Sequence, residues 1–233
     1  MSRPRSPAGR RERTATADDP VAAVAQFASA GRHQEAIEAA TSALKGAKVV
    51  QRIDLLDLRA ESRIALGRVA EAAGDADAML AAAQAARKPA LVAKALSRRA
   101  LVEMRSGRPR DAASSARDAL QAAERSRNTF SKAMALLRLG EAEFRSGNAS
   151  AGHRASAQAA REFKALGNAR YEGHAHWGCS ASLSRLGKGV AADRAARKAV
   201  SLARECGDLA GLGNALNMLT FHEPDIAERM RSS

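Results

Sequence analysis

Aromatic residues are scarce in this 233-residue chain, at 3% of its composition. A compact globule of this length normally fills its core with more large side chains, but here much of the 45% apolar content is alanine. Alanine has the best helix propensity and lets backbones approach one another closely. Residues typical of strands are few and scattered, so we expect an all-α protein.

Several other features are missing. No segment approaches the roughly 20 consecutive apolar residues that span a membrane. A signal peptide needs an apolar run after its basic residues, but ADDP follows the arginine-rich start. Two cysteines, Cys179 and Cys206, do not make a disulfide framework. These absences lead us to expect a cytoplasmic protein of bacterial type.

The chain also lacks recognisable catalytic motifs, such as a nucleophile elbow, a phosphate-binding glycine loop or an H-E-x-x-H helix. The most reactive stretch is HAHWGC, from His174 to Cys179. On a helix, His174 and His176 lie about 200° apart, and the pair His176 and Cys179 is too small a ligand set for zinc. We therefore expect no catalytic residue, no metal and no cofactor, and interpret HAHWGC as core and groove residues.

Positive charge is in excess, with 38 Lys and Arg against 25 Asp and Glu, a net charge of +13. Such a balance favours anionic partners but says nothing about fold. Part of it is local, because residues 1–17 hold five arginines and one glutamate. That segment has no hydrophobic periodicity, and we expect a disordered basic tail there.

What the chain does have is an internal repeat. Gly67, Gly107, Gly147 and Gly187 stand 40 residues apart, with Gly31 a slightly shorter step upstream. Small residues follow each glycine at two fixed distances, and a second set of turn residues keeps the same period. The first small column is Ala36, Ala72, Ala112, Gly152 and Ala192, the second is Ala43, Met79, Ala119, Ala159 and Ala199, and the turn residues are Lys88, Asn128, Asn168 and Asp208.

Each period is long enough for two helices joined at the glycine, which adopts positive φ at little cost. One such unit cannot bury its apolar face alone, so neighbouring units must stack. We expect a right-handed α-solenoid over residues 18–233, with repeats at 18–48, 50–88, 90–128, 130–168, 170–208 and a partial 210–233. Pro224 would close the first helix of the last unit, which favours a fragment of a longer protein over an array whose end docks on a partner.

The pattern resembles the tetratricopeptide repeat, most clearly in ALLRLGEAEFRSGNASAG, where Leu139–Gly140 matches the family's Leu-Gly step and Gly147 its turn glycine. The 40-residue period is similar to that of kinesin light chains and of bacterial signalling and regulatory proteins. The departures are the period of 40 instead of 34, the missing aromatics and a closing proline found only at Pro89. HEAT and armadillo solenoids fit less well, because they do not use the small-residue ladder in this register.

In that family the first helix of each pair lines a concave groove. The resemblance therefore implies a groove that is acidic at Asp54, Asp57 and Glu61, basic in the middle, and apolar and amide-bearing towards the end. Its partner-binding residues would be Lys94, Arg98, Arg105, Met134, Leu137, Phe144, Arg145, His174, Trp177, Arg185, Asn214 and Asn217.

Some of these residues have a second interpretation. Arg105, Arg145 and Arg185 recur every 40 residues and would hold carboxylates of an acidic peptide, but arginine near a helix C-terminus also complements the helix dipole. Trp177 would anchor an apolar side chain of a ligand or pack internally. Asn214 and Asn217 would bind the ligand's backbone.

These observations favour a non-catalytic module that binds a peptide or partner protein in the groove, with an acidic peptide among the candidates. The alternative is a regulatory segment of a larger bacterial signalling protein, such as a nucleotide cyclase or a transcription regulator. Nucleic-acid binding is disfavoured, because single strands need aromatic stacking platforms and the chain has one Trp and one Tyr. The sequence leaves the oligomeric state open.

Overall fold

A computed structural model describes residues 19–220 of the chain, and this part contains eleven α-helices and no strand. The tail expected over residues 1–17 and the closing residue Pro224 lie outside the described residues. The helices are α1 (Pro20–Ser29), α2 (His33–Ala43), α3 (Val49–Ala65), α4 (Val69–Ala85), α5 (Pro89–Arg105), α6 (Pro109–Ser126), α7 (Thr129–Arg145), α8 (Ala149–Ala165), α9 (Ala169–Arg185), α10 (Gly189–Cys206) and α11 (Leu209–Thr220).

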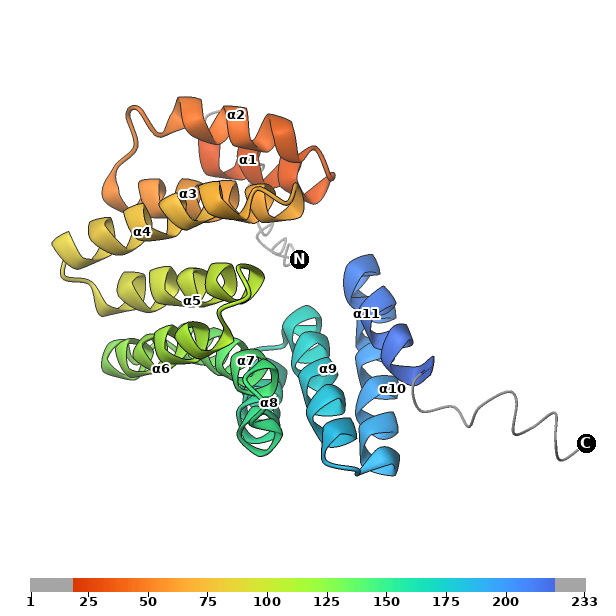
Figure 1. The fold of residues 1–233 in the computed structure, drawn as a ribbon. Coiled ribbons are helices and arrows are strands. Elements are labelled where there is room, and N and C mark those ends of the chain that lie inside the picture. The colour runs from red at the N-terminus through yellow and green to blue at the C-terminus, as the bar shows by residue number, and fades with distance from the viewer. Residues whose placement is uncertain (1–18, 221–233) are drawn as a thin grey trace, which may run out of the picture.

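Successive helices pack as hairpins that follow one another along a curved path (Figure 1). From α3 onward, odd helices begin every 40 residues, at Val49, Pro89, Thr129, Ala169 and Leu209. Each odd helix also contacts the next odd helix, whereas within the described chain no even helix contacts another even helix. The odd helices therefore form the inner side of the curve, and the expectation of an all-α solenoid of stacked helix pairs is confirmed.

The 40-residue glycines end the odd helices. Gly31, Gly67, Gly107, Gly147 and Gly187 all have φ between 70° and 92°, the left-handed region in which side chains with a Cβ are strained. After α3, the N–H of Gly67 donates to the carbonyl of Ile64 at 3.0 Å, and the N–H of Arg68 donates to the carbonyl of Arg63 at 2.8 Å. This is the Schellman arrangement, which satisfies carbonyls at the helix end.

The second column of turn residues begins the odd helices. The side chains of Asn128, Asn168 and Asp208 accept hydrogen bonds from backbone N–H groups three residues later, at 2.8, 3.2 and 3.1 Å. These are N-caps, which satisfy donors left free by the first helical turn. Lys88 makes no such bond and is followed instead by Pro89 at the first helical position, where proline is well tolerated.

Alanine builds the core. All five members of the first small-residue column are buried, and so are the members of the second column except Ala43, which is half-buried. The packing is tightest where α7 meets α8, because a Cβ added at Gly140 would lie 2.9 Å from the backbone N of Ser156 and 3.2 Å from the carbonyl O of Gly152. The small side chains therefore set the distance between helices, as the sequence predicts.

Candidate partner-binding surface

The inner surface presents one face of each odd helix, and residues 40 apart occupy equivalent places on neighbouring helices. On α3 this face carries Asp54, Asp57 and Glu61, and on α5 it carries Lys94 and Arg98. Side chains of adjacent units therefore meet across the joint between helices. Their charges decide which of them are available to a partner.

The acidic and basic groups of α3 and α5 form one ion-pair network. Lys94 Nζ lies 2.7 Å from Asp54 and 3.3 Å from Asp57, and Arg98 lies 2.5 Å from Asp57 and 3.2 Å from Glu61. The side chain of Arg98 is 9% exposed. The acidic end and basic middle expected from the sequence are thus not separate zones, because the 40-residue register stacks opposite charges beside one another.

The network shifts the proton affinities of its members. Burial alone would raise the pKa of Asp57, but the charges of Arg98 and Lys94 and their hydrogen bonds hold that pKa below its usual value. Burial would likewise lower the pKa of Lys94, and the carboxylates of Asp57 and Asp54 raise it instead. Lys94 and Arg98 are therefore charged and already compensated within the chain.

Arg138, which the sequence analysis did not name, is the under-compensated cation of this surface. It stands 40 residues after Arg98 on α7, and its side chain is 15% exposed. Its nearest carboxylate is Glu141 at 3.9 Å, and its Nε makes no hydrogen bond among the described residues. Ser97 and Leu101 occupy on α5 the places that Asp57 and Glu61 occupy on α3, so no acid faces Arg138 from the preceding unit.

The surroundings of Arg138 also disfavour its protonated, charged form. Burial lowers the pKa of Arg138, and the nearby charge of Arg98 lowers it further, while the charges of Glu141 and, more weakly, Glu61 only partly oppose them. Glu141 is also shared with Arg145, whose Nε lies 3.4 Å away. Within ion-pair distance, two guanidinium groups therefore share the one carboxylate of Glu141. The 40-residue register from Arg98 is the signal that would have found Arg138.

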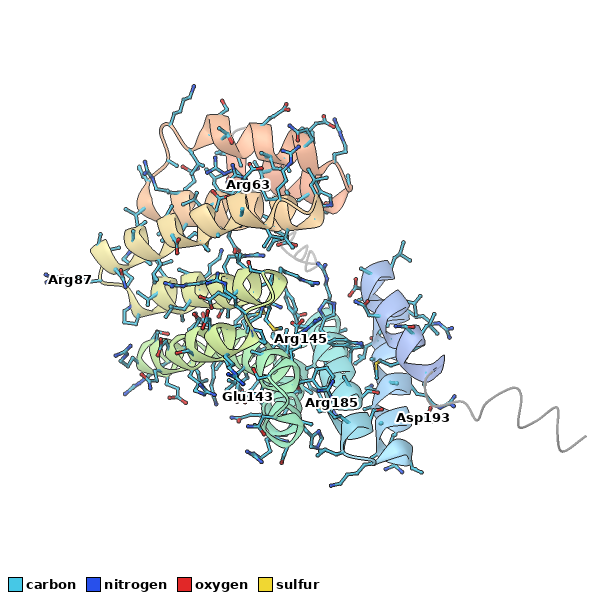
Figure 2. The ribbon with its side chains drawn as sticks, viewed as in Figure 1. Arg63, Arg87, Glu143, Arg145, Arg185 and Asp193 are labelled. Atoms are coloured by element: carbon cyan, nitrogen blue, oxygen red, sulfur yellow. The ribbon has the colours of Figure 1, made fainter. Side chains whose placement is uncertain are left out.

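The three arginines of the expected ladder lie in the last turns of α5, α7 and α9. Arg105 is exposed and makes no ion pair within residues 19–220. The guanidinium carbon of Arg185 lies 4.7 Å from the centroid of the Phe144 ring, a cation–π contact that brings Arg185 beside the turn of Arg145 (Figure 2). Both interpretations of the ladder are compatible with this arrangement, since the same positions complement the helix dipoles.

The apolar residues assigned to the groove are mostly packing residues. Leu137 is 5% exposed within the cluster around Phe163, so its assignment to the groove was wrong. Met134 packs against the same cluster. Trp177 packs against Ala199 and the neighbouring apolar residues where α9 meets α10 and α11. Phe144 is half-buried and covered by Arg185.

His174 tethers α11 to α9. Its Nε2 lies 2.7 Å from Oδ2 of Asp208, and the other oxygen of Asp208 accepts from the N–H of Gly211. Burial would raise the pKa of Asp208, but the bonds from His174 and Gly211 and the nearby Arg170 hold it below its usual value. His174 is therefore engaged in holding the next unit, and Asn214 and Asn217 lie exposed on that unit's helix.

The remaining residues of HAHWGC are structural. Cys179 is 5% exposed, and burial raises the pKa of its thiol to about 12, so it carries almost no thiolate at neutral pH. Burial also lowers the pKa of His176, which lies 3.7 Å from Glu172. Within residues 19–220 no three His, Cys, Asp or Glu side chains are placed to hold a metal ion.

No protein-family model and no curated protein matches the chain. Solved structures do. The tetratricopeptide-repeat sensor-bearing signal transduction ATPase (STAND) of Pyrococcus horikoshii matches with a TM-score of 0.68 at 14% identity, over 87% of this chain and 32% of that protein. The chain thus spans about a third of that protein's length.

Two further structures match over most of their length. A thermophilic tetratricopeptide-repeat protein of Thermus thermophilus gives a TM-score of 0.62 at 19% identity, over 86% of this chain and 97% of that one. A Rap protein in complex with the Competence and Sporulation Factor gives 0.61 at 11% identity, over 90% and 64%. The expected tetratricopeptide-repeat fold is confirmed. No helix of the described part is long and apolar enough to cross a membrane.

Proposed function

We propose that this chain, which has the fold of tetratricopeptide-repeat proteins, is a non-catalytic module that binds an acidic segment of a partner protein on its inner surface. The observation that carries the proposal is the charge imbalance on α7, where Arg138 and Arg145 share the single carboxylate of Glu141. An acidic ligand would supply the missing carboxylates.

The ligand would lie along the C-terminal units. Its carboxylates would bind Arg105, Arg138, Arg145 and Arg185, and Asn214 and Asn217 would contact its backbone. Charge-assisted hydrogen bonds to arginine are strong and geometrically specific because the guanidinium presents a planar fork of donors. The Rap protein named above is bound to the Competence and Sporulation Factor in its structure, which supports a ligand-binding role for this fold.

The test compares two triple variants in quantitative affinity capture and in titration with a fluorescent glutamate-rich peptide. R105A/R145A/R185A removes the ladder on the inner surface, and R110A/R125A/R204A removes the same charge from exposed positions of the even helices α6 and α10. We expect the first to weaken binding at least about tenfold, since each bond to a charged group contributes roughly 1.5–3 kcal/mol. Equal losses in both variants, with helicity unchanged, would refute the assignment to the inner surface.

A second candidate role is that of a regulatory segment in a larger signalling protein. The likeness to a sensor-bearing signal transduction ATPase, of which this chain covers 32%, supports it. The reading frame of the gene is the test: continuation into a further domain would favour this role, and a stop codon directly after Ser233 would count against it. Two free cysteines support a reducing compartment for either role, and we propose the cytoplasm.

A further inference from the structure

The outer side of the solenoid carries a cavity of about 590 Å³ over α9, between α8 and α10. Its floor is apolar and made by Cys179 and Leu183 of α9 together with Ala157 and Ala195 of the flanking helices. The helices α8 and α10 both pack on α9 but do not contact each other, so they form two separate walls. A volume of this size lies in the range of ligand-binding sites.

In the preceding units charged side chains lie at the equivalent place. A cavity of about 480 Å³ also lies over α3, but its lining includes the arginines Arg52 and Arg59. Arg59 and Arg63 of α3 each lie 2.6 Å from Asp75 of α4, and Arg99 lies 3.0 Å from Glu103 on α5. These charged side chains occupy the outer faces of α3 and α5.

An ion pair also lies at this place in the fourth unit. Glu143 of α7 pairs with Arg117 of α6 (Figure 2 labels Arg63 and Glu143). Forty residues later, Leu183 stands where Glu143 stands and Ala157 stands where Arg117 stands. The fifth unit therefore lacks the ion pair found at this place in its neighbours. Its cavity has an apolar floor instead, whose residues Cys179 and Leu183 are 5% and 7% exposed.

Positive charge borders this floor on both walls. Arg161 and Lys164 lie one helical turn apart on α8, and Arg194 and Lys198 lie one turn apart on α10. All four side chains are exposed, and none makes an ion pair in the part of the chain that the structure describes. Among the lining residues Glu172 is acidic, and it is buried beside His176. The rim thus offers two uncompensated rows of cations.

We propose that this outer cavity, defined by Arg161, Lys164, Arg194, Lys198 and the floor of α9, binds an amphipathic acidic helix of a partner protein. An apolar stripe would lie on the floor, and rows of Asp or Glu on both sides of the stripe would face the two walls. A single carboxylate, as in a fatty acid, reaches one wall only and leaves the other row unpaired. A helix with acidic flanks matches both rows, as flanking charges do in coiled coils.

The probe is a labelled synthetic helix of about 14 residues, or four turns, with leucines on one stripe and glutamates beside it. Two matched peptides replace either the leucines with glutamine or the glutamates with lysine. Fluorescence polarisation with the full chain should show binding of the first peptide, at least about tenfold weaker binding of the glutamine peptide because of the lost apolar burial, and no binding of the lysine peptide.

Three variants assign that binding to the cavity. R161E/R194E should reduce affinity about tenfold or more and favour the lysine peptide. R110E/R125E changes the same charge at exposed positions of α6, outside the cavity, and should leave affinity within about twofold. A157R/L183E installs the Arg117–Glu143 pair of the fourth unit and should abolish binding by covering the floor. All of these positions lie outside the inner surface.

Several results would contradict the binding of an acidic helix in this cavity. Equal binding of the leucine and glutamine peptides, or equal losses in R161E/R194E and R110E/R125E, would indicate attraction to net charge alone. If the peptide fails to bind but dodecanoate binds and loses binding in A157R/L183E, the cavity takes a small amphiphile instead. Circular dichroism of A157R/L183E checks that the fold is retained, and R161E/R194E tests the proposal without touching the floor.

Discussion

Adding one methyl group at Gly140 should destabilise the protein, although the same change usually stabilises a helix. Glycine in a helix interior costs about 1 kcal/mol relative to alanine, so helix propensity alone favours Gly140→Ala. The structure opposes this, because the new Cβ would lie 2.9 Å from the backbone N of Ser156 and 3.2 Å from the carbonyl O of Gly152. Both are main-chain atoms of α8 and cannot rotate away.

The sizes of these two effects decide whether Gly140→Ala stabilises or destabilises the protein. Overpacking of a well-filled joint costs typically 1–3 kcal/mol, and here the obstacle is backbone, so the upper part of that range applies. Subtracting the gain in propensity leaves a net loss of about 1–2 kcal/mol for Gly140→Ala. Gly74 on α4 is the matched control, since a Cβ added there meets nothing within 4 Å. Gly74→Ala should therefore stabilise by about 0.5–1 kcal/mol.

Urea unfolding followed by circular dichroism measures both changes, with hydrogen exchange of α7 and α8 as a local readout, because solenoids can unfold in parts. We expect a lower midpoint for Gly140→Ala and a higher one for Gly74→Ala. A midpoint for Gly140→Ala equal to or above that of the unmodified chain, while Gly74→Ala stabilises as expected, would refute the claim that small residues set the distance between helices.

Three further predictions concern single side chains. Arg127 has φ of 52° where later units carry glycine, so Arg127→Gly should raise the free energy of unfolding by about 1 kcal/mol in urea denaturation; a loss would contradict the strain. The pKa of Asp208 is lowered by bonds that include one from His174, so its stabilisation is present above the unfolded value of about 3.9 and is lost as pH falls through the lower folded value; hydrogen exchange of α11 should accelerate there, and Asp208→Asn should flatten that pH dependence. At pH 8 a thiol reagent should modify Cys206 at once and Cys179, whose pKa is about 12, only after denaturation, whereas rapid loss of two thiols in the native protein would contradict its burial.

The turns were predictable from the sequence because their chemistry is local. A glycine every 40 residues needs only its own φ to end a helix, and the Asn and Asp column needs only a side-chain oxygen near the next N–H groups to begin one. The small-residue columns were predictable for a similar reason, since one helix face repeats in every unit. Ala43 is only half-buried, and it is the residue at which α2 ends.

The candidate partner-binding surface was harder to predict because it depends on the boundary between buried and exposed faces of a helix. Leu136, Leu137 and Arg138 are consecutive, and the first two are buried while the third lies at the inner surface. An error of one position, or about 100° around a helix, moves a residue from groove to core. That is how Leu137 was assigned to the groove and Arg138 was left out.

Repetition supplies a way to locate functional positions that no single unit reveals. On the inner side, Arg98 has the acids of α3 opposite it, whereas Arg138 meets Ser97 and Leu101 at the equivalent places. On the outer side, Glu143 has its arginine, whereas Leu183 meets Ala157. A charge left without its partner, or an apolar floor left without its cover, is costly unless another molecule completes it, and in this chain both gaps fall in the fourth and fifth helix pairs.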